Sequence, residues 1–298
     1  MPLVSTVNSK SQLKIDLHSH TLHSDGQLSP TELIQRAHNM QLDVLSITDH
    51  DSIDGLNEAH VYQAKQKRPL TIINGIELST RWHGFDIHIV GLNIDVSNQQ
   101  FQARVAQQHE TRRARAEKIA YKLALCGFTQ AQDVLHDRCD EQITRSHFAH
   151  AMVRAGFVKD HQQAFKQYLG KGKRAFVAPH WITIAEAVEW LHDAGGQAVL
   201  AHPTHYDMTT KWLRRLVAEF AAVEGDGIEV NYPNLTPEKQ KLLLEIAELH
   251  DLKGSVGSDF HYPSRWTELG RRSTIPDEIE PIWHDWTIAM PITKAHPL

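Results

Sequence analysis

The sequence predicts an α/β fold in which seven strands form a barrel, and three observations support this. Seven short runs rich in β-branched residues recur along the 298-residue chain. Helical patterns separate several of these runs, and alternating strands and helices are typical of a parallel sheet. Many runs end in a histidine or a carboxylate, and the C-terminal ends of barrel strands meet at one face. An open doubly wound sheet is the alternative, but no glycine-rich dinucleotide-binding turn follows the first strand.

The predicted strands share apolar, β-branched sequences. In chain order they are Leu13–His18, Val44–His50, Thr71–Glu77, Asp86–Gly91, Ala198–His202, Gly227–Val230 and Gly254–Asp259. Two helices have clear start signals. Ser29 is placed as the N-cap of a helix over Pro30–Met40, and Thr236 as the N-cap of a helix over Pro237–His250.

The chain between the fourth and fifth strands differs from the rest because it is mostly helical in pattern. We therefore divide the chain into a first barrel part (13–96), a helical insertion that caps the barrel mouth (97–183), a second barrel part (184–275) and an aromatic, proline-rich tail (276–298). The insertion contains the basic residues Arg112, Arg113 and Arg115. We interpret these three as ordinary charge on a helix surface.

Composition excludes several classes of protein. The formal net charge of −5 argues against a protein that coats nucleic acid through overall positive charge, although a local basic groove stays open. The two cysteines, Cys126 and Cys139, cannot form a disulfide framework. No apolar run approaches the ~20 residues that cross a bilayer, and the polar first dozen residues lack a signal peptide's apolar segment. We expect a cytoplasmic protein.

Histidine is abundant, with 21 in the chain, and several histidines follow predicted strands. The first strand runs into Asp16-Leu17-His18-Ser19-His20. Residues i and i+2 of an extended segment point the same way, so His18 and His20 can bind one metal ion. Asp25 follows in a Ser-Asp-Gly turn, from which its carboxylate can project. Taken alone, such a histidine pair is more often found on a surface or in a core than at a metal.

The other strands supply further ligand types, which strengthens the prediction. These are His50 within Asp49-His50-Asp51, Glu77, His88, His202 in Ala-His-Pro, and Asp259 and His261 on either side of Phe260. The full set is too large for one tetrahedral ion but suits two or three ions that share a carboxylate. Mixed imidazole and carboxylate ligands favour zinc, manganese or iron over calcium. The sequence therefore predicts a site for several divalent metal ions.

In this order the motifs resemble the polymerase-and-histidinol-phosphatase (PHP) superfamily. They read DLHSH, SDG, ITDHD, GIE, HIVG, AHP and GSDFH along the chain. The resemblance covers roughly Leu13 to Arg272, with the insertion inside it. It implies a distorted seven-stranded PHP barrel that holds two or three metal ions, with manganese expected first and zinc, iron(II) or magnesium as alternatives.

The resemblance also implies how the ligands divide among the ions. One ion would take His18, His20, Glu77 and Asp259, a second would share Glu77 and add His88 and His202, and a third would take Asp25, His50 and His261. Asp25 stands where many relatives have histidine, so the identity of the third metal is open. Two such ions can hold a bridging hydroxide for in-line attack on phosphorus. His205 is the candidate general acid, and an exposed loop histidine is the alternative interpretation.

Basic residues of the insertion are candidates for substrate binding. Arg145 and His147 lie at a predicted helix start, and a helix N-terminus with an arginine suits phosphate. Lys171 lies in a glycine-flanked loop. A solvated basic face is the alternative for both groups. The order of TRSH, GKGKRAFV and AHP resembles the family's bacterial phosphoesterases that act on 5′-phosphorylated nucleotides.

That branch removes the 3′-phosphate of nucleoside 3′,5′-bisphosphates and trims short RNA from a 5′-monophosphate end. The resemblance implies that Arg145, His147 and Lys171 hold the 5′-phosphate, with nucleotides or short RNA or DNA as substrates and neither a membrane nor an obligate protein partner. A phosphatase for histidinol phosphate or another small phosphomonoester is one alternative. A polymerase-associated or nucleic-acid-binding module without catalysis is another, and the acidic charge and complete ligand set count against it.

Overall fold

The barrel is built from seven strands in the part of the chain that the computed structural model describes, residues 13–137, 142–264 and 267–288. The strands are β1 (Ile15–Asp16), β2 (Val44–Ile47), β3 (Thr71–Trp82), β4 (Phe85–Leu92), β5 (Gln197–Leu200), β6 (Gly227–Asn231) and β7 (Lys253–Val256). They lie side by side in sequence order. The Leu17 amide donates to the Val256 carbonyl at 3.1 Å, so the ends of β1 and β7 meet and nearly close the sheet.

The prediction of an all-parallel sheet is wrong at β4, which pairs antiparallel with both β3 and β5. The other strand pairs are parallel. The reason is a tight turn at His83 and Gly84, both with positive φ, which joins β3 and β4 as a hairpin instead of a helical crossover. β3 also continues to Trp82, so Glu77 lies within the strand and not at its end.

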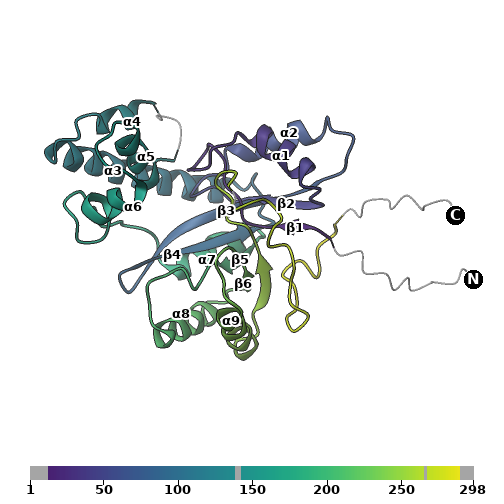
Figure 1. The fold of residues 1–298 in the computed structure, drawn as a ribbon. Coiled ribbons are helices and arrows are strands. Elements are labelled where there is room, and N and C mark those ends of the chain that lie inside the picture. The colour runs from purple at the N-terminus through teal and green to yellow at the C-terminus, as the bar shows by residue number, and fades with distance from the viewer. Residues whose placement is uncertain (1–12, 138–141, 265–266, 289–298) are drawn as a thin grey trace, which may run out of the picture.

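The helices surround the sheet and extend to one side of it. They are α1 (Pro30–Asn39), α2 (Gly55–Gln63), α3 (Gln99–Leu125), α4 (Ala131–Asp137), α5 (Arg145–Arg154), α6 (His161–Ala164), the π-helical turn η1 (Phe165–Leu169), α7 (Ile184–Asp193), α8 (Thr210–Ala222) and α9 (Pro237–Leu249). α1 and α9 confirm the two predicted helices, with Ser29 and Thr236 as N-caps. Figure 1 shows α4, α5 and α6 at the upper left, beyond the strands, and α8 and α9 below them.

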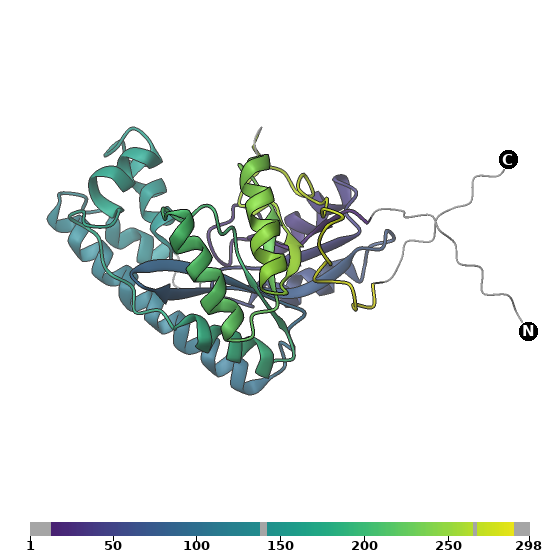
Figure 2. The ribbon, with the colours of Figure 1, turned by 90° about the horizontal axis from the view of Figure 1, so that it is seen from below.

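The apolar core has separate parts in the barrel and in the insertion. The barrel interior is filled by residues in or directly after the strands and by one tail residue, namely Ile15, Leu17, Val44, Ile73, Val90, Leu92, Val199, Ala201, Val256 and Ile282. The insertion has its own core, which includes Phe128, Phe148 and Met152. α3 takes part in two cores, because Phe101 packs with the barrel and Ile119 with the insertion. The change of packing therefore falls along α3, which Figure 2 shows running beneath the strands. The domain boundaries stay a prediction.

The described part of the tail packs against the barrel. Ile282 lies among the interior residues, and its amide donates to the Gly254 carbonyl at 2.9 Å. The Trp286 indole donates to the Gln197 side chain at 2.7 Å. Because Gln197 and Gly254 lie at the starts of β5 and β7, the tail covers the barrel end opposite the predicted metal site. The described residues do not include the polar first dozen residues, Cys139 or residues 289–298.

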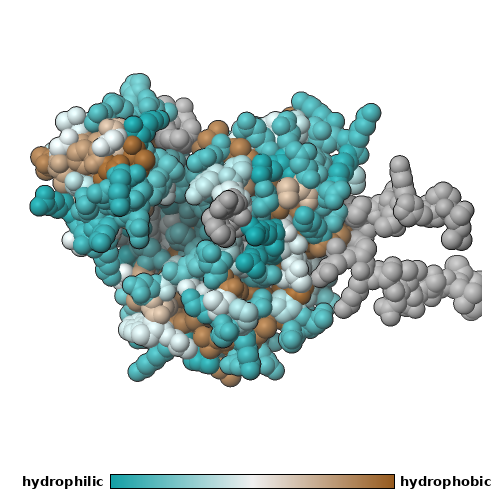
Figure 3. All heavy atoms as spheres, viewed as in Figure 1, coloured by the Kyte–Doolittle hydropathy of each residue, from teal (hydrophilic) through white to brown (hydrophobic). Residues whose placement is uncertain are grey.

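Hydrophilic residues cover most of the molecular face in Figure 3. Hydrophobic residues gather on that face over the helical segment at the upper left and in scattered positions over the lower helices. None of the helices in the described ranges combines the length and the apolar character that crossing a membrane requires.

Candidate metal centre and substrate pocket

The nine predicted ligands come together in space, although they are spread over most of the chain. They form overlapping groups whose nitrogen and oxygen atoms lie within 4.8 Å of one another, namely His18/Glu77/His202, His18/His20/Asp259, His50/Glu77/His88 and His20/Asp25/His50/His261. Most of them follow the C-terminal ends of β1, β2, β5 and β7. Glu77 and His88 face the same point from within the β3–β4 hairpin. We call these nine residues the ligand cluster.

Glu77 lies at the centre of the ligand cluster and is fully buried. Imidazole nitrogens surround both of its carboxylate oxygens. Oε2 lies 3.3 Å from His18 Nε2, 3.3 Å from His20 Nε2 and 3.0 Å from His50 Nδ1, and Oε1 lies 2.9 Å from His88 Nδ1 and 3.0 Å from His202 Nε2. Burial alone would raise the pKa of the Glu77 carboxyl, but the surrounding histidines hold it well below its usual range. Glu77 is therefore an anion that can bridge two cations.

Asp25 and Asp259 supply carboxylates on the other side of the cluster. His261 Nε2 lies 3.2 Å and His50 Nε2 3.7 Å from Asp25 Oδ1. Asp259 Oδ1 lies 3.2 Å from His20 Nε2 and 3.5 Å from His18 Nε2. The three carboxylates thus each face several imidazoles, which is the arrangement expected where ions lie between them.

Several atoms of the cluster are buried without a hydrogen-bond partner among the described residues. They include His18 Nε2, His20 Nε2, Asp25 Oδ1, His50 Nδ1 and Glu77 Oε2. These atoms approach one another closely, yet their directions do not allow hydrogen bonds. A buried polar atom without a partner is costly, and such atoms need an explanation such as a bound ion. Their convergence fits divalent metal ions, which would accept all of these lone pairs at once.

Glu229 on β6 supports the cluster, although the sequence reasoning missed it. Its Oε1 accepts a hydrogen bond from His18 Nδ1 at 2.7 Å, and its Oε2 accepts one from the His202 amide at 2.5 Å. A carboxylate that binds the far nitrogen of a ligand histidine fixes the ring and its tautomer. The signal in the sequence was a glutamate within the apolar strand Gly-Ile-Glu-Val. Asp49 acts one contact further away, because it accepts from the Thr21 amide at 2.7 Å and from the Ser24 hydroxyl at 2.5 Å, and that hydroxyl lies 3.4 Å from His20 Nδ1.

The backbone brings the ligands inward through unusual local conformations. His202 and Asp259 have φ values of +27° and +48°, in the left-handed region that L-residues rarely adopt. Such strain is typical of functional sites, where surrounding contacts hold it in place. Gly257 allows the end of β7 to approach β1, because an added Cβ would lie 2.3 Å from the Cβ of His18. The strand ends therefore meet closely enough to place His18 beside Asp259.

A cavity of about 160 Å³ adjoins the ligand cluster, and we call it the arginine pocket. Asp25, His50 and His88 line it from the barrel. The insertion contributes a set of arginines and aromatic residues, Arg112 and Arg115 on α3, Arg145 at the start of α5, Phe165 and Trp181. The interpretation of Arg112 and Arg115 as surface charge is therefore wrong. Both are buried, because this face of α3 packs over the barrel mouth.

The arginine pocket holds positive charge that described carboxylates only partly balance. Arg112 binds Asp51, and Arg145 Nη2 lies 3.6 Å from Asp86, which also binds Arg81. Arg115 makes no ion pair with a described residue. Its Nε donates to the Val177 carbonyl at 3.1 Å, and its buried Nη2 has no described hydrogen-bond partner. Burial, together with the charges of Arg145 and Arg112, lowers the pKa of Arg115 to about 9. An anion in the pocket would satisfy Arg115.

Comparison with known proteins places the chain in a family. The model of the PHP domain matches residues 16–262. The chain belongs to the PHP domain family. Among curated PHP relatives, a 5′-3′ exoribonuclease of Haemophilus influenzae is 44% identical over 91% of this chain and 98% of its own length. A 3′,5′-nucleoside bisphosphate phosphatase of Chromobacterium violaceum is 38% identical over 91% of this chain and 95% of its own length.

A solved structure supports the same relationship for this PHP domain. It is of a Chromobacterium violaceum protein described as an amidohydrolase, with bound sulfate and no metal. It superposes with a TM-score of 0.83 and 37% identity, covering 91% of this chain and 94% of the other. The predicted PHP barrel is therefore confirmed.

Three other residues that the sequence singled out lie outside the arginine pocket. Lys171 is exposed, and its ammonium donates to the Gly84 carbonyl at 3.2 Å. His147 faces a second cavity on the far side of α5, and its Nδ1 accepts from the Thr144 amide at 3.0 Å. Neither therefore joins Arg145 as predicted. His205 Nε2 donates to the Pro233 carbonyl at 3.0 Å, and burial and His202 lower its pKa. Both properties count against His205 as the general acid of this PHP enzyme.

Proposed function

We propose that this chain is a metal-dependent phosphoesterase that acts on 5′-phosphorylated nucleotides at the phosphorus on their 3′ side. The observation that supports this is the shared wall of the ligand cluster and the arginine pocket. Asp25, His50 and His88 belong to both. A substrate with one phosphate in each place would be held at two points, and its second phosphate would lie at the metals.

The reaction adds the oxygen of water to phosphorus and breaks the bond between phosphorus and the ribose 3′-oxygen, which takes up a proton. Divalent ions supply a water activated near neutral pH and neutralise the charge of the phosphoryl group when they are bound. The role of this chain's own residues is to hold those ions and the substrate. Glu77 would bridge two ions. The three ligand sets that the family pattern implies remain a proposal, because the closest groups pair Glu77 with His18 and His202 and with His50 and His88. Manganese is the metal that we propose first.

The arginine pocket would bind the 5′-phosphate. We propose Arg145, Arg115 and Arg112 for this role, in place of the predicted set of Arg145, His147 and Lys171. Planar guanidinium groups bind phosphate through charge-assisted, often bidentate hydrogen bonds. The unsatisfied Nη2 of Arg115 is the atom most directly available. A 5′-phosphate would thus bring the 3′ side of the same nucleotide to the ligand cluster.

This geometry would accept both substrates that the names of the relatives describe. A nucleoside 3′,5′-bisphosphate and a 5′-phosphorylated RNA have the same first nucleotide and the same bond between phosphorus and the 3′-oxygen. They differ only in what else the phosphorus carries. The first product is a nucleoside 5′-monophosphate in either case, and the second is inorganic phosphate or a shortened RNA with a new 5′-phosphate.

The test uses the purified protein with manganese and four substrates. These are adenosine 3′,5′-bisphosphate, a short 5′-phosphorylated RNA, the same RNA with a 5′-hydroxyl, and histidinol phosphate. We expect turnover of the first two, weak turnover of the 5′-hydroxyl RNA, and none with Asp259→Ala. Arg115→Ala should raise KM for both good substrates by about tenfold or more, since one charge-assisted contact contributes about 1.5–3 kcal/mol.

Arg113→Ala is the matched control for the arginine pocket. Arg113 is on the same helix, its side chain is 36% exposed, and it faces Glu117 at 3.8 Å. We expect its kinetics to match the wild type. Equal rates on the 5′-phosphate and 5′-hydroxyl RNAs would contradict the proposed pocket. Hydrolysis of histidinol phosphate alone would keep the metal chemistry and overturn the nucleotide substrate.

A further inference from the structure

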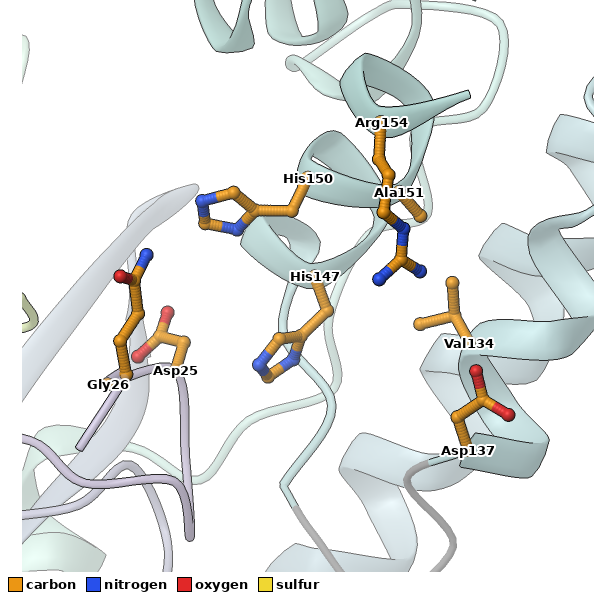
Figure 4. Close-up of a pocket in the computed structure, with 9 residues that line it drawn as sticks. Asp25, Gly26, Val134, Asp137, His147, His150, Ala151 and Arg154 are labelled. Carbon is orange, nitrogen blue, oxygen red and sulfur yellow. The ribbon is translucent and has the colours of Figure 1, made fainter. Parts of the chain in front are cut away.

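A second cavity of about 280 Å³ lies on the other side of α5 from the arginine pocket. We call it the downstream cavity. Its lining includes Asp25 and Gln27 from the barrel and His147, His150 and Arg154 from α5. Figure 4 shows His147 and His150 directed towards the loop that carries Asp25, and Arg154 directed towards Val134 and Asp137. Asp25, a member of the ligand cluster, lines both cavities.

The helical period of α5 explains this arrangement. His147, His150, Ala151 and Arg154 are spaced by three, four and seven positions and therefore form one stripe along the helix. Arg145 and Ser146, in the first turn, line the arginine pocket instead. The Thr144 hydroxyl donates to Asp25 Oδ2 at 3.1 Å and ties the start of α5 to the cluster. α5 thus separates two polar cavities that share one carboxylate.

We propose that the downstream cavity binds the RNA nucleotide on the 3′ side of the phosphate that is cut. This inference rests on the proposed function. When the first nucleotide occupies the arginine pocket and the phosphorus lies at the ligand cluster, the rest of an RNA must leave the cluster in another direction. The downstream cavity provides a route that begins at Asp25. A nucleoside bisphosphate ends at the phosphorus and would not enter it.

The chemistry of the stripe fits a sugar-phosphate chain. Arg154 is exposed at the last turn of α5, where its guanidinium can meet the next phosphate. His147 and His150 add imidazoles along the wall, and Gln27 and Asp137 offer acceptors for hydroxyl or amino groups. Arg154 is therefore the residue that would distinguish an RNA from a bisphosphate.

The decisive experiment compares two substrates in one variant. Arg154→Ala should lower kcat/KM for the 5′-phosphorylated RNA by about tenfold, mainly through KM, and change kcat/KM for adenosine 3′,5′-bisphosphate by less than about twofold. Arg154→Glu should lower kcat/KM for the RNA further. Arg154→Lys should retain most of the wild-type kcat/KM, because it keeps the positive charge. Thermal unfolding of each variant checks that the protein is intact.

A binding measurement provides a readout that does not depend on turnover. The inactive Asp259→Ala protein is titrated with a fluorescent 5′-phosphorylated RNA at several salt concentrations. Adding Arg154→Ala should raise Kd and reduce the slope of log K against log salt by about 0.7, the value for one phosphate contact on a single strand. Arg214→Ala is the charge-matched control, because Arg214 is an exposed arginine on α8 that lines neither cavity.

The outcomes separate this inference from the proposed function. Equal losses of kcat/KM for the RNA and for the bisphosphate after Arg154→Ala would overturn the downstream assignment. An unchanged kcat/KM for the RNA would overturn it too. In both cases the proposed function would stand. A wild-type protein that turns over neither substrate would overturn both.

Discussion

The carboxylate of Asp51 binds the guanidinium group of Arg112 and so joins the barrel to α3. Arg112 Nε donates to Asp51 Oδ2 at 3.0 Å, and the Ser79 amide donates to Oδ1 at 2.8 Å. Burial alone would raise the pKa of Asp51, but Arg112 lowers it. Asp51 directly follows His50, so this buried pair connects a ligand of the cluster to the arginine pocket.

Replacing one partner of this pair should destabilise the protein. Asp51→Asn leaves the buried guanidinium of Arg112 without its counter-charge, and breaking a buried pair in this way costs about 3–5 kcal/mol. Urea unfolding measures the loss. The double variant Asp51→Asn/Arg112→Met should lose less than the sum of the single variants, because the unpaired charge is gone. Arg214→Ala, at an exposed position on α8, should change stability by less than about 0.5 kcal/mol. Additive losses would contradict direct coupling.

Glu229→Gln should weaken metal binding without unfolding the protein. Glutamine keeps the size of the side chain but loses the charge that orients the His18 ring through Nδ1, so we expect affinity to fall by about 10–100-fold. Calorimetric titration with Mn²⁺ measures it. The control is Glu248→Gln, because Glu248 is an exposed glutamate on α9. We expect this variant to bind Mn²⁺ with the affinity of the wild type. Unchanged affinity in Glu229→Gln would show that Glu229 does not position His18.

Removing metal should lower the thermal stability of the wild-type protein. Bound ions stabilise the folded state by about 2.7 kcal/mol when their concentration is 100 times Kd, and a chelator removes this contribution. We expect Tm to fall by several degrees with EDTA and to recover with Mn²⁺. Glu77→Gln, which weakens the bridging position, should respond less to both treatments. A wild-type Tm that is insensitive to EDTA would contradict the metal site.

The contact between Glu268 and Arg36 should make stability depend on pH. Arg36 Nε donates to Glu268 Oε1 at 2.8 Å, which ties the last described segments to α1. Burial would raise the pKa of Glu268, but Arg36 holds it below its usual value. A lowered carboxyl pKa stabilises the fold above the unfolded pKa of about 4.3, and this contribution is lost as pH falls through the folded pKa.

Glu268→Gln should therefore be less stable than the wild type at pH 7, by about 0.5–1 kcal/mol for a partly exposed and screened pair. The difference should shrink below about pH 4. Thermal unfolding at several pH values, in the presence of EDTA, separates this effect from metal release. A difference that is constant from pH 7 to pH 3.5 would show that the charge of Glu268 does not contribute.

Strand ends and ligand types could be predicted from the sequence because they depend on local patterns. Apolar β-branched runs mark the strands, and the residues that follow them meet at one end of a barrel. The position directly after a predicted strand was enough to identify His18, His50, His202 and Asp259 as candidate ligands. Glu77 and His88 were found for the same reason, although the hairpin that contains them reverses β4, since a two-residue turn at His83 and Gly84 leaves little signal.

The function of the basic residues was decided by tertiary structure alone. Residue type does not show which of three neighbouring arginines faces the barrel. The three are Arg112, Arg113 and Arg115. The direction in which α3 crosses the barrel mouth buries Arg112 and Arg115 and leaves Arg113 partly exposed. In the same way, the orientation of α5 about its own axis places Arg145 in the arginine pocket and His147 in the downstream cavity. The sequence determined which residues could bind metal and phosphate. Packing between the insertion and the barrel determined which of the basic residues reach the site, because a helix's orientation depends on contacts distant in the chain.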